Sequence, residues 1–153
     1  MVALGGRLAL LATVLVLVLG GCGDVRTCSG LCGGQTDPPF TATLAPTYLA
    51  IQRGETIAGP LTLDIHSEYP FIPFTVSVCL RNRDGSSPPP GIYLAGTDPN
   101  NPWSCVIGGV EGTARYELFI ALHPDIAPRI YYLRFRVANE YLVRNLDFAL
   151  EVR

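Results

Sequence analysis

From Phe40 onward, apolar and polar residues alternate along the chain, and this alternation restricts the fold more than any other feature of the sequence. Every second residue is apolar in the segments LTLDIH (61–66) and FTVSVCLR (74–81), and residues 116–122, 131–137 and 142–152 follow the same pattern. A period of two places successive side chains on opposite faces of a β-strand, so that one face can be buried. Proline and glycine residues separate the runs, as turns between strands require. The sequence therefore predicts half-buried antiparallel strands and no helix in this region.

We expect residues 40–153 to form an all-β domain in which about seven short strands build two antiparallel sheets that pack face to face. A domain of this length buries roughly two thirds of the surface that its unfolded chain exposes, which is enough to fold by itself. The predicted core consists of the apolar members of the runs: Leu61, Leu63, Ile65, Phe74, Val76, Val78, Leu80, Tyr116, Leu118, Ile120, Leu122, Tyr131, Leu133, Phe135, Val137, Leu142, Leu146, Phe148, Leu150 and Val152.

The start of the chain has the pattern of a secretory signal. Arg7 precedes the apolar run 8–19, which as a helix would span about 18 Å at roughly 1.5 Å per residue and would fall short of the ~30 Å hydrocarbon core. The run ends in LGGC (19–22), which resembles the lipobox of bacterial lipoprotein precursors. The resemblance implies cleavage before Cys22 and acylation of its thiol and of the new amino terminus. An ordinary secretory signal and an uncleaved anchor are the alternatives.

This resemblance divides the chain into a signal peptide (1–21), a lipid-anchored flexible linker (22–39) and the β domain (40–153). The linker is rich in glycine, proline and polar residues and has no apolar periodicity. Two or three acyl chains on Cys22 would hold the protein on a membrane of the cell envelope. In enteric-type sorting an aspartate directly after the lipidated cysteine favours the inner membrane, so Gly23 at that position favours the outer membrane, with the domain facing either the periplasm or the exterior.

The five cysteines, Cys22, Cys28, Cys32, Cys79 and Cys105, leave one thiol unpaired in an exported protein. Lipid on Cys22 would leave four that can pair, in a compartment where disulfides persist. Their order suggests the pairs Cys28–Cys32 and Cys79–Cys105. A metal bound by Cys28 and Cys32 is the weaker alternative, since no second pair of ligands stands nearby.

A bond between Cys79 and Cys105 would lie on the outer face of a sheet. Cys79 alternates with the apolar residues of its run and shares the polar face with Ser77 and Arg81. The bond would fasten the loop that carries Trp103 to this face. Closing a loop of about 25 residues contributes on the order of 3 kcal/mol to stability.

The order of the segments also resembles the immunoglobulin-like modules of bacterial envelope and secreted proteins. The segments are PTYLAIQRGE, FTVSVCL, PPPGIYLAG, ARYELFIALHPDIAPRIYYLRFRV and LDFALEV, and they cover most of residues 40–153. The likeness implies an immunoglobulin-like β-sandwich. It departs from the modules at Arg129, where the late turn often has glycine, and in the long connection 82–105. Such sandwiches serve as spacers, adhesion units and ligand binders, so the likeness concerns the fold and not an activity.

The sequence offers no set of catalytic residues. His66 and His123 are the only imidazoles, and no G-x-S-x-G motif occurs. His66 lies on the polar side of its run and His123 begins the turn HPD, so we expect both at the surface. Asp64 and His66 share one strand face, but two ligands do not make a metal site. We therefore expect no enzymatic activity, no cofactor and no metal.

One loop carries the residue types of a ligand site. Asp98, Asn100 and Asn101 have oxygen atoms that calcium accepts, and Trp103 could stack on a sugar. Asp-Pro and Asn-Pro pairs are, however, first of all turn formers. Our main hypothesis is a non-enzymatic envelope lipoprotein whose domain is a structural or protein-interaction module. The alternative is a carbohydrate- or calcium-binding module that uses the loop 97–105.

The charge of the chain bears on its partners. Thirteen acidic and eleven basic residues give a formal net charge of −2. A mildly acidic chain argues against nucleic acid as a partner. Besides the membrane, we expect an envelope protein or a glycan to be the partner.

Overall fold

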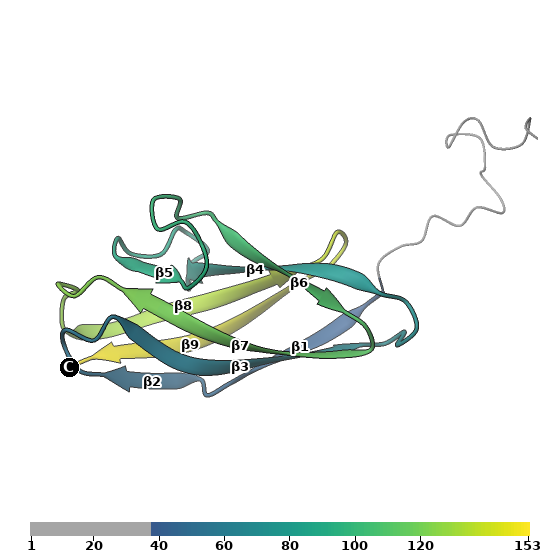
Figure 1. The fold of residues 1–153 in the computed structure, drawn as a ribbon, viewed down its shortest axis with the longest axis horizontal. Coiled ribbons are helices and arrows are strands. Elements are labelled where there is room, and N and C mark those ends of the chain that lie inside the picture. Colours follow the sequence, from purple (N-terminus) through teal and green to yellow (C-terminus); the bar gives the residue numbers. More distant parts are fainter. Residues whose placement is uncertain (1–37) are drawn as a thin grey trace, which may run out of the picture. The chain divides into compact units, whose positions relative to one another are not determined.

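The computed structural model describes residues 38–153, which form a sandwich of two β-sheets (Figure 1). The predicted signal peptide, Cys22 and the pair Cys28–Cys32 lie outside the described residues. Residues 38–153 contain no helix, and hence none that is long and apolar enough to span a membrane. The strands are β1 (Phe40–Ala45), β2 (Tyr48–Ile51), β3 (Ile57–Ser67), β4 (Phe74–Asn82), β5 (Ile92–Leu94), β6 (Cys105–Val110), β7 (Thr113–Leu122), β8 (Arg129–Ala138) and β9 (Val143–Val152).

The connectivity is that of an immunoglobulin-like domain. The first sheet has the strand order β1-β3-β7-β5 and the second has the order β2-β9-β8-β4-β6. The chain changes sheet at every connection from β1 to β8, and only β8 and β9 follow each other within one sheet. Strand β3 pairs with β7 in the first sheet, and β4 pairs with β8 in the second. All pairs are antiparallel except β2 with β9, which is parallel. The predicted immunoglobulin-like sandwich is confirmed.

A tyrosine corner at the turn before β8 supports this assignment. The hydroxyl of Tyr131 donates a hydrogen bond of 2.7 Å to the carbonyl oxygen of Ala127, and the ring is buried. Immunoglobulin-like sandwiches have this feature at the same corner, where antibody domains carry a cysteine two residues later. Here that position is Leu133, which is fully buried. Arg129, the predicted departure from the pattern, places its guanidinium 4.6 Å from the centre of the Tyr131 ring.

The core lies between the sheets and consists of the predicted faces together with residues of the short outer strands, namely Phe40, Ile51, Ile92, Leu94 and Val110. The inward residues of β3, β4 and β8 are all buried, while Tyr116, Leu142 and Leu146 are only partly buried. Phe135 and Phe148 stack with their ring centres 5.0 Å apart. The alternation in the sequence thus identified most of the core and missed the part that the short outer strands contribute.

Residues 38–153 form nine strands where about seven were expected. The five longest, β3, β4, β7, β8 and β9, correspond to the alternating runs. The other four are the outermost strands of the two sheets and have three to six residues each. A short outermost strand contributes few residues to the core, so its alternation is brief and hard to detect.

The two lateral edges of the sandwich are built differently. At one side, which we call the closed edge, β1 pairs with β3 in the first sheet, and the chain then turns so that β2 pairs with β9 in the second. Phe40 and Ile51 of this segment are buried between the sheets. At the other side, which we call the open edge, β5 borders the first sheet and β6 borders the second. Strand β5 is much shorter than its neighbour β7 (Figure 1).

Candidate functional site

The predicted ligand loop uses its polar side chains for turns. The Asp98 carboxylate accepts a hydrogen bond of 2.9 Å from the Asn100 amide, and the Asn101 side-chain oxygen accepts one of 3.1 Å from the Trp103 amide. These are the local bonds by which Asp and Asn stabilise turns. Trp103 remains 56% exposed. Contact with calcium or a glycan at this loop stays a prediction.

The predicted disulfide between Cys79 and Cys105 is present. The two residues are direct neighbours in the β4–β6 pairing, and Cys79 is on the outer face of its sheet as expected. The loop before β6 covers this face, so Cys79 and Arg81 are buried although they point away from the core. The Arg81 guanidinium donates hydrogen bonds to the carbonyl oxygens of Pro102 and Trp103 and lies 4.6 Å from the Trp103 ring centre. Burial lowers the pKa of Arg81 because the charged form loses solvation.

The predicted surface histidines are exposed and each has a local neighbour. His66 Nδ1 lies 3.0 Å from the Thr113 hydroxyl oxygen, and His123 Nδ1 lies 3.6 Å from the Asp125 carboxylate. Asp64 pairs with Arg115 at 2.6 Å, and this hydrogen bond lowers the pKa of Asp64. No group of three or more His, Cys, Asp or Glu side chains is close enough to hold a metal within residues 38–153.

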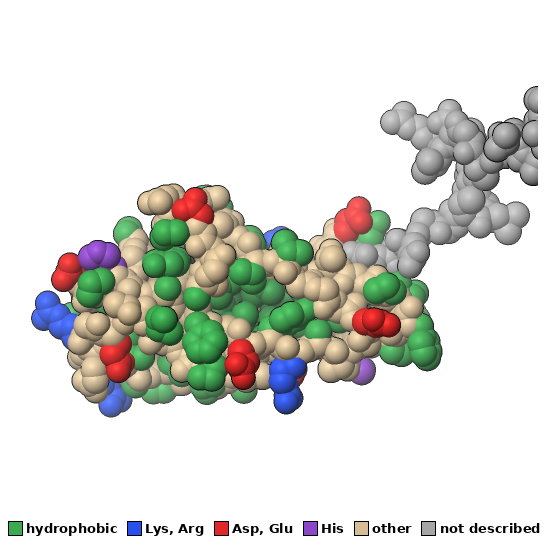
Figure 2. Space-filling view, viewed as in Figure 1, with side chains coloured by type: hydrophobic (Ala, Val, Ile, Leu, Met, Phe, Trp, Pro, Cys, Tyr) green, Lys and Arg blue, Asp and Glu red, His purple; other side chains and the backbone are tan. Residues whose placement is uncertain are grey.

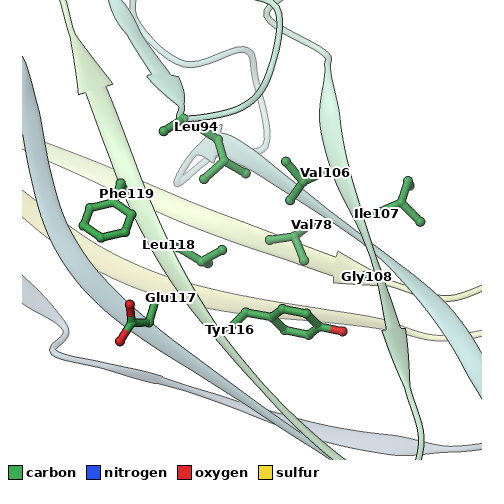
Figure 3. Close-up of a pocket in the computed structure, with 10 residues that line it drawn as sticks. Val78, Leu94, Val106, Ile107, Gly108, Tyr116, Glu117, Leu118 and Phe119 are labelled. Atoms are coloured by element: carbon green, nitrogen blue, oxygen red, sulfur yellow. The ribbon is translucent and has the colours of Figure 1, made fainter.

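An apolar groove opens between β6 and β7 at the open edge (Figure 3). We call it the β6–β7 groove. Its volume is about 220 Å³. It exists because β5 pairs with β7 only from Ile120 to Leu122, so that the rest of β7 has no strand on this side within the described residues. The main lining side chains are Val78, Leu94, Val106, Tyr116, Leu118 and Phe119.

Within residues 38–153, both walls of the groove present backbone groups without a strand partner. The Cα atoms of Cys79 and Cys105 are 4.4 Å apart, the spacing of a non-hydrogen-bonded pair. Pairs alternate along the ladder, so the N–H and C=O groups of Ile107 point away from β4. On β7, the carbonyl oxygen of Phe119 accepts a bond of 2.9 Å from Ala95, which places the backbone groups of Glu117 on the same, open side. The groove is thus flanked by the hydrogen-bonding edges of two sheets.

Tyr116 bridges the groove at one end. Its side chain extends from β7 towards β6 (Figure 3), and its hydroxyl donates a hydrogen bond to the carbonyl oxygen of Gly109. A Cβ atom at Gly108 would lie 2.7 Å from the Tyr116 ring, so only glycine leaves room for this crossing. Burial raises the pKa of the Tyr116 hydroxyl, which keeps it a donor. The bridge fixes the distance between the two walls.

The groove has the chemistry of a site for apolar side chains. It is smaller than the roughly 300–1,000 Å³ of typical small-molecule pockets, and Glu117 is the one carboxylate among its lining residues. A cavity of about 150 Å³ with apolar walls is known to take up benzene, so this groove has room for an aromatic or branched aliphatic side chain. The sequence analysis missed the site. The pair Gly108-Gly109 inside a strand was the available signal, because glycine there often marks a close approach of other atoms.

Comparison with known proteins gives matches to solved structures only. No family model and no curated protein matches this chain. The chain is similar to the E. coli chaperone DraB, with 17% identity and a TM-score of 0.49 over 74% of this chain and 55% of that one. It is similar to a chain of the Salmonella enterica SafA pilin–SafB chaperone complex, with 17% identity and a TM-score of 0.46 over 77% and 56%. A family 123 glycoside hydrolase from Clostridium perfringens matches with 14% identity and a TM-score of 0.46 over 74% and 27%.

The chain therefore spans about half of the first two structures and about a quarter of the third. The immunoglobulin-like assignment given above rests on the strand order and the tyrosine corner.

Proposed function

We propose that this protein is a non-enzymatic, lipid-anchored protein of the bacterial cell envelope whose immunoglobulin-like domain binds a protein partner by strand addition at the open edge. The observation that carries the proposal is the juxtaposition of an unpaired strand edge and an apolar groove. In strand addition, main-chain hydrogen bonds provide affinity and pockets for alternate side chains provide specificity. The open edge offers both.

The bound segment would continue the short strand β5. It would run antiparallel to β7, beyond the point where β5 leaves the sheet, and exchange hydrogen bonds with the backbone of Glu117. Period two would direct every second side chain inward, and one of them would enter the groove between Leu118 and Val106. The partner is therefore an extended segment with an apolar residue at the inward position.

The lipid anchor is supported by the lipobox sequence at 19–22. The disulfide Cys79–Cys105 supports export, because such bonds persist in oxidising compartments outside the cytosol. Intact-mass measurement of the membrane-extracted protein tests the anchor. We expect a chain that begins at Cys22 and carries two or three acyl groups. A soluble product without lipid would refute the anchor and leave the binding proposal standing by itself.

A library of extended peptides tests the binding proposal. We expect the selected peptides to alternate apolar and polar residues and to lose about tenfold or more affinity for Val106→Phe, which fills the groove and removes the burial of the inward side chain. Ile107→Phe is the matched control, since it adds the same side chain to the same strand. Ile107 borders the groove, but its side chain is 70% exposed and points to the outer side of β6 (Figure 3). Equal affinity for both variants would contradict the proposal.

A further inference from the structure

Three exposed aromatic side chains stand on two loops at one end of the domain. Tyr69 and Phe71 belong to the β3–β4 loop and are 54% and 93% exposed, and Tyr141 of the β8–β9 loop is 58% exposed. We call these three residues the aromatic tip. Phe71 has almost its entire ring in solvent, which is costly for a side chain of this size unless something covers it. Figure 2 shows hydrophobic side chains at this end of the surface as well as along the middle of the face.

The tip residues are held by ordered loops. The Ser67 hydroxyl accepts a hydrogen bond of 3.1 Å from the Tyr69 amide, and the Ile72 amide donates to the Tyr69 carbonyl oxygen at 3.1 Å. In the other loop, the Asn139 side-chain oxygen accepts a bond of 3.1 Å from the Tyr141 amide. The aromatic rings are thus presented by fixed backbone, so their insertion into a partner costs little conformational entropy.

The chain enters the domain between these two loops. The carbonyl oxygen of Pro39 accepts a hydrogen bond of 3.0 Å from the Glu68 amide, and that of Pro38 accepts one of 3.2 Å from the Asn139 side chain. The residue proposed to carry lipid, Cys22, precedes this point by sixteen positions. A segment of sixteen residues that behaves as a random coil has a mean span of about 20–25 Å. An anchor at Cys22 therefore brings this end of the domain to the membrane surface before any other part.

We infer that the aromatic tip inserts into the interfacial layer of the membrane that holds the lipid anchor. The inference rests on the proposed anchor at Cys22. Tyrosine and tryptophan rings concentrate at membrane–water interfaces, where one side of the ring is apolar and the other is wet. The tip loops (68–73 and 139–142) contain no Lys or Arg and include Glu68 and Glu140, so the attraction is apolar and not electrostatic.

The anchor and the tip depend on each other. A few aromatic side chains without basic residues bind a bilayer weakly, whereas an anchored domain meets the surface at a high effective concentration. Insertion would fix the orientation of the domain, with the end that carries the β3–β4 and β8–β9 loops at the membrane and the opposite end away from it. Trp103 lies beside Arg81 near the opposite end of β4 and would remain in water.

Fluorescence quenching by lipids brominated on their acyl chains tests the inference. The sample is the mature protein with Phe71→Trp and Trp103→Phe, reconstituted through its own acyl chains into phosphatidylcholine vesicles with or without phosphatidylglycerol. We expect blue-shifted, strongly quenched emission from position 71 that does not depend on salt. The protein with its natural Trp103 and Phe71 is the control, and its emission should not be quenched.

The same preparation separates the two proposals. If mass spectrometry finds the acyl chains but position 71 is no better quenched than Trp103, the tip inference is wrong and the anchor stands. If no acyl chains are found, the proposed anchor is wrong, and the tip is then tested on a chain held to nickel-chelating vesicles by a histidine tag at position 22. Quenching at position 71 in that sample supports the tip, and its absence refutes it. Tyr69→Ser with Tyr141→Ser should reduce the quenching severalfold in either preparation.

Discussion

The closed edge and the open edge of the sandwich differ in how the chain covers the rims of the two sheets. At the closed edge one continuous segment, residues 40–51, first pairs with β3 and then with β9, so that a single stretch of chain covers the rims of both sheets. Phe40 and Ile51 fill the space between them. At the open edge two separate strands share this task, and β5 has only three residues. The rims of the sheets are left apart, and Tyr116 crosses the gap in place of backbone.

This difference shows why a groove can persist in an otherwise well-packed domain. Natural sandwiches usually protect free strand edges, since an exposed edge invites pairing with another chain. In the described part of the chain, the edge of β7 is left free next to an apolar groove, and the wall formed by β6 is secured by the Cys79–Cys105 bond. The free edge of β7, which could otherwise favour aggregation, thus lies beside a wall that the disulfide holds in place. That arrangement is what we expect of a binding edge.

The largest effect should come from emptying the closed edge. Phe40 is fully buried and its ring centre lies 5.7 Å from that of Phe74. Phe40→Ala should lower the free energy of unfolding by about 3–5 kcal/mol, whereas Leu118→Ala beside the groove should cost only about 2 kcal/mol because its surroundings are already partly hollow. Urea denaturation followed by fluorescence gives both values. A cost for Leu118→Ala equal to that for Phe40→Ala would mean that the two edges are packed alike.

Removing the disulfide should loosen one wall of the open edge. The bond closes a separation of 26 residues, and the double substitution Cys79→Ala, Cys105→Ala should lower the free energy of unfolding by about 3 kcal/mol. Amide hydrogen exchange should then rise in β6 and stay unchanged in β2. Equal acceleration in both strands would show that the bond stabilises the whole domain and not this wall.

The bridge across the groove can be tested at Gly108. Gly108→Ala places a Cβ atom against the Tyr116 ring and should lower the free energy of unfolding by about 1–3 kcal/mol. Gly109→Ala is the matched control, because a Cβ there meets no atom within 4 Å and should change stability little. The cost of Gly108→Ala should largely disappear in a Tyr116→Ala background, measured as a double-mutant cycle. An unchanged cost in that background would rule out the bridge as its cause.

The smallest effect concerns an ion pair that lies away from both edges. Arg134 donates to the Asp147 carboxylate at 2.6 and 3.1 Å across the β8–β9 pair, and this lowers the pKa of Asp147. Because the pKa of the Asp147 carboxyl is lower in the folded state, the pair stabilises the fold at pH values above the pKa of that carboxyl in the unfolded chain, near 3.9. This contribution is lost as the pH falls through the folded-state pKa. Asp147→Asn should cost under about 1 kcal/mol at pH 7, since the pair is partly exposed. The two proteins should become equally stable at low pH, and a difference that persisted there would have another origin.

Alternation in the sequence was enough to predict the long strands, most of the core and the outer-face position of Cys79. Each of these follows from side-chain periodicity, which a sequence records residue by residue. The Cys79–Cys105 pair followed from parity and order and was confirmed. The late turn of the immunoglobulin-like resemblance contains Tyr131, whose buried hydroxyl bond defines the corner.

The open edge could not be predicted in the same way. Its groove depends on where β5 ends and on the fact that β5 borders one sheet while β6 borders the other. Both are outcomes of pairing between distant segments, and the connection 82–105 carries no alternation that would reveal them. Tyr116 was placed correctly on the inward face, but its bond to Gly109 joins two sheets and appears only in three dimensions. The alternation of apolar and polar residues therefore does not predict sites that form at strand ends and at the rims of the sheets.

Backbone amide exchange with a bound library peptide tests the central claim most directly. The claim is that the open edge binds an extended segment alongside β7. We predict that the peptide slows exchange of the Glu117 amide, and that amides of β1 and β2 at the closed edge exchange as before. A peptide that binds tightly but protects the closed edge or the loop 97–105, and leaves Glu117 unprotected, would contradict the account.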